Sequence, residues 1–277
     1  MKFKLSVLAL VATALTVGTA AADQLADIKS NGTLTCGTLG TAEPFSFADP
    51  NTREIVGYDV DLCQAIADDM GVKLVMKPMS VEARIPELVQ GRVDVLAGNL
   101  GYTPERAEQI DYTTAYFVSL QKLLVKASSE FAAIDDLAES RISAPKGSSS
   151  ERYVRDALPQ ASLLTFQDPP SAFLALAQSK VDAMILSEIN AEKFVAQTGE
   201  KFKFVDQAVA KEFWGLGIRK GETALLEQVN ATLKRLEESG EGQKIFDKWL
   251  GEETTYKLKK PFKFDEPVSD PVLRPAQ

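Results

Sequence analysis

The 277-residue chain contains no histidine. Without an imidazole, Ser-His-Asp and Cys-His catalysis are excluded, and a zinc site loses its most common nitrogen ligand. The sequence also shows no cofactor motif. We therefore expect no catalytic residue, no metal ion and no cofactor.

Cysteine is almost absent, with Cys36 in an expected strand and Cys63 in an expected helix. Two interpretations stay open. A pair of buried apolar thiols is favoured, because sequence alone does not give the Cα separation that a disulfide requires. A disulfide is the alternative if the chain reaches an oxidising compartment.

The chain has no excess of basic residues, since 31 Lys and Arg stand against 39 Asp and Glu, a net charge of −8. Nucleic acid and anionic membrane surfaces attract proteins of the opposite charge. We therefore expect neither as a partner.

Long apolar runs are missing as well. The run at residues 5–17 follows Lys2 and Lys4 and is too short to span a bilayer. Together with the small residues 20–22 it predicts a secretory signal peptide, with cleavage expected before Asp23. The mature chain is therefore expected in the periplasm of a Gram-negative source.

The most informative stretch is residues 80–117. Residues 93–97 are an apolar run suited to a buried parallel strand. Residues 98–101, rich in glycine, then leave backbone N–H groups free at the end of the strand where open α/β sheets bind ligands. Thr103 and Pro104 predict a helix start that holds Arg106 one short turn from this loop.

Strands and helices alternate along the rest of the chain, which predicts an α/β fold with a mostly parallel sheet covered on both faces. Asp59 is expected to cap the first long helix, which ends before Gly71. The pattern starts afresh at Lys122. Beyond Leu250 it loses periodicity, so we expect an extended tail that lies on the surface or is disordered.

Three short motifs occur in a fixed order: Arg84-Ile85-Pro86, Asp94-Val95 and Thr103-Pro104-Glu105-Arg106. With the loop between them, they resemble the periplasmic solute-binding proteins of polar amino acid ABC transporters, the bacterial extracellular solute-binding family 3. The resemblance implies a two-lobe periplasmic binding protein-like II (Venus flytrap) fold with mixed, mostly parallel sheets. Lobe 1 is expected at residues 23–121 and 217–252, lobe 2 at 122–216 with hinge strands at its ends, and the tail at 253–277.

The resemblance also implies which residues hold a ligand carboxylate. Arg106 would bind it through its planar donor fork, and Asn99 and Gly101 would add N–H donors. Ser148 and Ser149, which open a helix in lobe 2, would bind it from the opposite side. Three structural alternatives stay open: Arg106 as a surface arginine paired with Glu105 or Glu108, Gly101 as a turn glycine, and the serines as a helix cap.

Arg84 is the residue that discriminates between ligand classes. A second fixed cation suits a second carboxylate, so an acidic side chain on the ligand is one hypothesis. A solvated arginine on a helix is the other.

The sequence departs from the family pattern at two kinds of position. Ala42 and Val81 stand where the family has aromatic residues, and Ser187 stands where it has the aspartate that binds the ligand ammonium. Glu188 or Glu43 is expected to serve instead. Otherwise the ligand is a carboxylate without an α-ammonium.

These expectations combine into one prediction, a non-enzymatic solute-binding component of an ABC importer. It would capture an amino acid with an acidic or polar side chain by hinge closure and deliver it, as a monomer, to a membrane ABC permease. The alternative is a periplasmic dehydratase-like enzyme on the same fold, with a protonated Glu188 or Glu43 as the acid.

Overall fold

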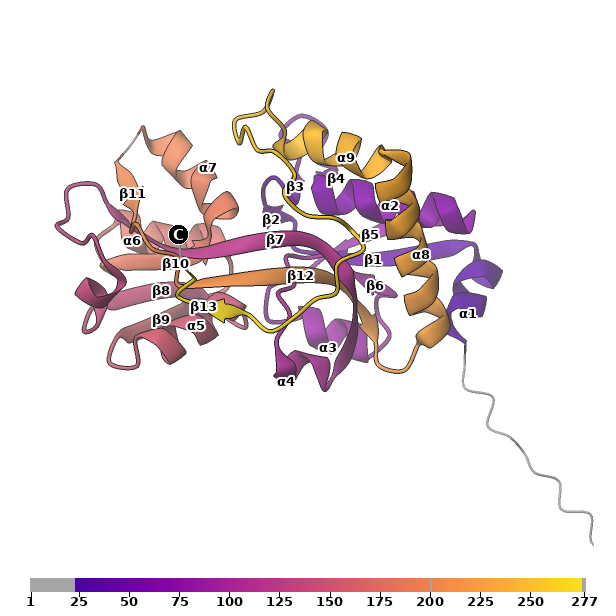
Figure 1. Cartoon of the computed structure of the whole chain (residues 1–277), viewed down its shortest axis with the longest axis horizontal. Helices are drawn as coiled ribbons and strands as arrows, with labels where there is room; N and C mark the ends of the chain where they lie inside the picture. Colours follow the sequence, from indigo (N-terminus) through magenta and orange to yellow (C-terminus); the bar gives the residue numbers. More distant parts are fainter. Residues whose placement is uncertain (1–22, 200, 276–277) are drawn as a thin grey trace, which may run out of the picture.

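The computed structural model describes residues 23–199 and 201–275. The signal peptide prediction falls on residues 1–22, outside this part. Two lobes lie side by side and are joined by two long strands (Figure 1). None of the described helices is long and apolar enough to span a membrane.

The elements follow in chain order. The helices are α1 (Gln24–Asn31), α2 (Tyr58–Met70), α3 (Arg84–Val89), α4 (Pro104–Ala107), the 3-10 helix η1 (Ile134–Leu137), α5 (Ser149–Ala157), α6 (Pro169–Ala177), α7 (Glu188–Thr198), α8 (Thr223–Ser239) and α9 (Glu241–Leu250). The strands are β1 (Thr33–Thr38), β2 (Thr41–Ala42), β3 (Ser46–Ala48), β4 (Ile55–Val56), β5 (Lys73–Pro78), β6 (Val95–Leu96), β7 (Ile110–Lys126), β8 (Arg141–Pro145), β9 (Ser162–Phe166), β10 (Ala183–Ser187), β11 (Phe202–Phe204), β12 (Ala210–Arg219) and β13 (Val272–Leu273).

One sheet runs through both lobes in the order β5-β1-β6-β12-β7-β10-β8-β9. At its flanks the pairing is parallel, between β1 and both β5 and β6, and between β8 and both β9 and β10. The crossing strands β7 and β12 pair antiparallel along their whole shared length. The predicted two-lobe α/β fold with a mixed sheet is confirmed.

The hydrophobic core of lobe 1 is built from both ends of the chain. Leu34 and Ile66 from the first half pack in one cluster with Leu233 and Phe246 from α8 and α9. Lobe 2 has separate clusters formed by residues between Leu123 and Ala210. Burial of each apolar face therefore requires the chain to leave lobe 1 and return to it, which β7 and β12 accomplish (Figure 1).

Helix α2 begins two residues earlier than expected. Its N-cap is Gly57, with φ 140°, and Asp59 lies inside the first turn rather than capping it. A Cβ at Gly57 would lie 2.2 Å from the carbonyl oxygen of Phe45, so only glycine fits there. At the other end, Gly71 adopts the left-handed conformation, as predicted for a C-terminal cap.

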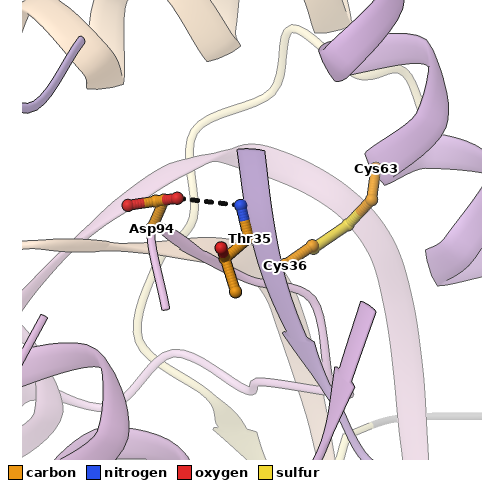
Figure 2. The surroundings of a disulfide bond; sticks show 4 residues. All are labelled: Thr35, Cys36, Cys63 and Asp94. Carbon is orange, nitrogen blue, oxygen red and sulfur yellow. Dashed lines mark hydrogen bonds between the residues drawn. A yellow bond between two sulfur atoms is a disulfide. The ribbon is translucent and has the colours of Figure 1, made fainter. Parts of the chain in front are cut away.

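Cys36 and Cys63 form a disulfide that joins β1 to α2, with a Cα–Cα distance of 6.4 Å (Figure 2). The favoured interpretation of two free buried thiols is therefore wrong. On the other side of β1, the Asp94 carboxylate accepts a hydrogen bond of 2.8 Å from the Thr35 backbone N–H, which ties the start of β6 to β1 (Figure 2).

The described part of the C-terminal tail is extended and mostly exposed, as expected of a segment on the surface, but two of its residues are packed into the core. Phe262 and Phe264 are buried in the core of lobe 1. The tail then runs back across the crossing strands, where β13 pairs antiparallel with β12 (Figure 1). The guanidinium of Arg274 forms an ion pair of 2.6 Å with Asp135 in lobe 2. The tail therefore contacts both lobes.

Candidate ligand-binding site

A small cavity lies between the lobes, where both meet the crossing strands. The residues that line it are Leu39, Val81, Arg84, Asn99, Gln121, Pro145, Ser148, Ser149, Ser150, Pro169, Leu186, Ser187, Asn190, Glu212 and Trp214. Its volume is about 30 Å³, enough for one or two water molecules. An amino acid therefore enters only if the lobes separate or side chains shift.

Arg84, the first residue of α3, points into this cavity and is buried, with 3% of its surface exposed. Its Nε donates to the Val81 carbonyl at 2.9 Å, and its Nη1 donates to the Asn99 carbonyl at 3.1 Å. Burial, followed by the positive charge of Arg106, lowers the pKa of Arg84 to about 9. The guanidinium is thus a buried cation and not a solvated surface group.

Arg106 bridges the two lobes at the edge of the site. Thr103 caps α4 as predicted, and its hydroxyl accepts from the Arg106 N–H at 3.3 Å. The guanidinium donates to the Gly101 carbonyl of lobe 1 at 2.7 Å and to the Gly147 carbonyl of lobe 2 at 3.0 Å. Its donors are thus used by carbonyl oxygens from both sides of the cleft.

Asn99 and Gly101 occupy the loop after β6. Asn99 has a left-handed backbone, φ 53°, and its side-chain amide is buried without a hydrogen-bond partner among the described residues. A Cβ at Gly101 would lie 2.3 Å from the Oε2 atom of Glu212. A larger residue at 101 would therefore displace the Glu212 carboxylate, which approaches from β12.

The N-terminus of α5 faces the cavity from lobe 2. Ser148 is its N-cap, and the Ser148 hydroxyl accepts from the Glu151 N–H at 3.1 Å, as the capping pattern predicted. Glu151 accepts in turn from the Gly147 N–H at 2.8 Å. Ser149 and Ser150 are buried and line the cavity. This end of the helix is suited to bind an anion.

The three residues predicted near the ligand ammonium occupy different surroundings. Ser187 lines the cavity and caps α7, its hydroxyl accepting from the Asn190 N–H at 3.3 Å. Glu188 forms an ion pair with Lys122 at 2.7 Å. Glu43 forms one with Lys193 at 2.5 Å. Neither glutamate lines the cavity, and their role in binding stays a prediction.

Glu212 on β12 was not predicted, although it lines the cavity with only 1% of its surface exposed. Its Oε1 accepts from the Gln121 side-chain amide at 2.6 Å and from the Trp214 indole at 2.7 Å. Its Oε2 accepts from the Tyr153 hydroxyl at 2.7 Å. The only signal in the sequence is an acid on the same face of a strand as buried Ala210, where an apolar residue is usual.

The model of bacterial extracellular solute-binding proteins, family 3, matches residues 34–252 of this chain. The chain is 32% identical over 236 residues to the ABC transporter glutamine-binding protein GlnH of Bacillus subtilis (strain 168), an alignment that covers 83% of this chain and 86% of GlnH.

Two solved structures resemble this one closely. A mutant of ArgBP from T. maritima superposes with a TM-score of 0.77 at 30% identity, covering 82% of this chain and 98% of that one. The ancestral amino acid-binding protein AncCDT-1, described as a precursor of cyclohexadienyl dehydratase, gives a TM-score of 0.75 at 31% identity, covering 83% and 100%.

Proposed function

Because the chain belongs to the bacterial extracellular solute-binding proteins of family 3, we propose that it captures an amino acid between its lobes and delivers it to a membrane ABC permease. GlnH, named as a glutamine-binding protein, and ArgBP are relatives that support an amino acid ligand. The chain would act as a monomer in the periplasm.

One observation carries this proposal: groups that bind anions approach the same cavity from both lobes. From lobe 1, Arg84 lines the cavity, and Arg106, which does not line it, donates to the same Gly147 carbonyl as Arg84. From lobe 2, Ser149 at the N-terminus of α5 lines the cavity. Arginine and helix N-termini are both suited to a carboxylate. Since each hydrogen bond to a charged group contributes about 1.5–3 kcal/mol, a ligand held from both sides favours the closed form.

Hinge closure is part of the proposal. The cavity of about 30 Å³ has room for one or two water molecules, so the lobes would separate for entry, breaking the contact between Arg106 and the Gly147 carbonyl. The ligand carboxylate would then accept hydrogen bonds from the Arg106 guanidinium, which now donates to the Gly147 carbonyl. Closure around the ligand would create the surface that the permease recognises.

An acidic or polar ligand side chain fits the lining best. Arg84 is a buried cation, and the amide of Asn99 has no partner within the described residues. Both would gain hydrogen bonds from a carboxylate or an amide on the ligand.

A thermal-shift screen of the refolded, ligand-stripped protein tests the proposal. A ligand at 100 times its Kd stabilises the folded state by about 2.7 kcal/mol, which raises the melting temperature by several degrees. We expect at least one amino acid to produce this shift, Arg106→Ala to abolish it, and Arg84→Ala to abolish any shift by glutamate or aspartate.

The control is Arg92→Ala, because Arg92 pairs with Glu87 at 2.7 Å and is half exposed, away from the cavity. It should respond like the wild type. If no amino acid produces a shift but a carboxylate without an ammonium does, the amino acid assignment is wrong.

A dehydratase-like activity is the second candidate, supported by the similarity to AncCDT-1. The two glutamates expected to supply the acid, Glu188 and Glu43, are each held by a lysine outside the cavity. Incubation with prephenate and detection of the aromatic product would test it. We expect no turnover.

A further inference from the structure

We infer that Glu212 receives the ammonium group of the bound amino acid, at a position different from Ser187. This inference rests on the proposed function, since it requires an amino acid in the cavity. It identifies Glu212 as a residue that determines specificity for zwitterionic ligands.

The first argument is the charge of the cavity lining. Arg84 and Glu212 are the ionisable side chains that line it, one a cation from lobe 1 and the other an anion from the crossing strand β12. Both are almost fully buried, and neither takes part in any ion pair between described residues. Burial lowers the pKa of Arg84 and the negative charge of Glu212 partly opposes this, but the two groups form no direct ion pair. A buried charge without an opposite charge in direct contact is unfavourable. A ligand with one carboxylate and one ammonium would neutralise both.

The second argument is the unused hydrogen-bonding capacity of Glu212. A carboxylate has about four acceptor sites, and three are filled by Gln121, Trp214 and Tyr153. All three donors are neutral, so they fix the orientation of the carboxylate without cancelling its charge. One acceptor site is left on Oε2.

The third argument is access to that oxygen. A Cβ at residue 101 would lie 2.3 Å from Oε2 of Glu212 and would close the approach to it. Gly101 adds no side chain at this position. The Gly101 carbonyl also accepts from Arg106, so the same loop residue lies between the cation expected to hold the carboxylate and the anion assigned to the ammonium.

The other candidate partners are already engaged. The hydroxyl of Ser187 caps α7, and a neutral hydroxyl does not balance a buried ammonium. Glu188 and Glu43 are paired with lysines and do not line the cavity. Glu212 is the acid already held at the cavity wall, on a strand shared by both lobes.

Isothermal titration calorimetry with matched ligand pairs tests the inference. The pairs are L-glutamine with 4-carbamoylbutanoic acid, L-glutamate with glutarate, and L-arginine with 5-guanidinopentanoic acid, which differ only in the α-amino group. We expect the wild type to prefer the amino acid of at least one pair. In Glu212→Gln the affinity for that amino acid should fall by about 10- to 100-fold, the equivalent of a hydrogen bond to a charged group.

The affinity of Glu212→Gln for the analogue without the amino group should change by less than about threefold. The variant should therefore lose most of the wild-type preference for the amino acid over its analogue. Equal weakening of both ligands would show a structural role for Glu212 and overturn the inference. The inference would also be overturned if Glu188→Gln or Glu43→Gln lost the preference for the amino acid and Glu212→Gln kept it. The control Glu238→Gln, on the exposed side of α8, should match the wild type.

Failure of the proposed function gives a different result. In that case no amino acid shifts the melting temperature of the wild type, whereas failure of the inference alone leaves wild-type binding intact. If Glu212→Gln does not fold, a crystal structure of the wild type with the bound amino acid decides. The ligand ammonium should lie within hydrogen-bond distance of Glu212, and contact with Ser187 alone would overturn the assignment.

Discussion

At the scale of single residues, Asp59 is the least expected feature of lobe 1. Both of its carboxylate oxygens are buried without a hydrogen bond of ordinary geometry to any described residue. Burial raises the pKa of Asp59 to about 7, and the neighbouring Tyr116 hydroxyl, Asn99 N–H and Arg84 charge only partly oppose this. The fold therefore favours the protonated carboxyl.

The sign of the resulting pH dependence follows from linkage. The folded protein binds the Asp59 proton more tightly than the unfolded chain, so this stabilisation is complete below pH about 4 and is lost as the pH rises through 7. The shift of about three pKa units corresponds to about 4 kcal/mol. We expect Asp59→Asn to become more stable relative to the wild type by a few kcal/mol between pH 4.5 and 7.5, measured by urea unfolding. A difference that does not change with pH would contradict this.

At the scale of elements, the disulfide fixes α2 on β1. It closes a loop with a sequence separation of 27 between Cys36 and Cys63. A loop of this length stabilises a fold by about 3.5 kcal/mol in the chain-entropy model. We expect the double variant Cys36→Ala and Cys63→Ala to lose about this much free energy of unfolding in urea. Its ligand affinity should stay within about twofold of wild type, because neither cysteine lines the cavity.

The C-terminal tail gives a second prediction at this scale. The family model ends at residue 252, yet Phe264 beyond it is fully buried against α8 and α9. We expect Phe264→Ala to reduce the free energy of unfolding by about 3–5 kcal/mol, the usual effect of deleting a buried aromatic ring. Val272→Ala in the same tail, at a half-exposed position, should change it by less than about 0.5 kcal/mol. Equal effects would mean that the tail does not pack as described.

At the scale of the whole molecule, ion pairs cross the rim of the cleft from lobe 1 to lobe 2. The described residues form three of them: Glu82 with Lys146, Glu105 with Arg152, and Glu43 with Lys193. All are partly exposed, so each contributes about 0.2–1 kcal/mol to closure and is screened by salt.

This arrangement predicts that the ligand-free protein opens as salt is added. Small-angle X-ray scattering should show a larger radius of gyration at about 1 M than at about 0.02 M NaCl, where the Debye length is far longer. The variants Lys146→Ala and Lys193→Ala should be more open at low salt. Lys234→Ala is the control, since Lys234 pairs with Glu238 within α8. A radius independent of salt in the wild type would show that the rim pairs do not hold the lobes together.

Much of this protein follows from the sequence alone. The alternation of strands and helices predicted the α/β class, because burial of a sheet on both faces leaves a local pattern. The cap at Thr103 and the glycine at 71 were also predicted, since they depend on neighbouring residues only. The sequence also singled out Arg84 as the residue that would discriminate between ligand classes, and in the structure it lines the cavity.

The tertiary structure decided which residues far apart in the chain contact each other. The bond between Cys36 and Cys63, the burial of Phe264 and the hydrogen bond between Gln121 and Glu212, which are 91 residues apart, depend on how elements pack in space. A periodic pattern indicates which face of an element is buried but not which element covers it. The same glutamate on an exposed strand would be an ordinary surface charge, and only the packing of both lobes around β12 places it in the wall of the cavity.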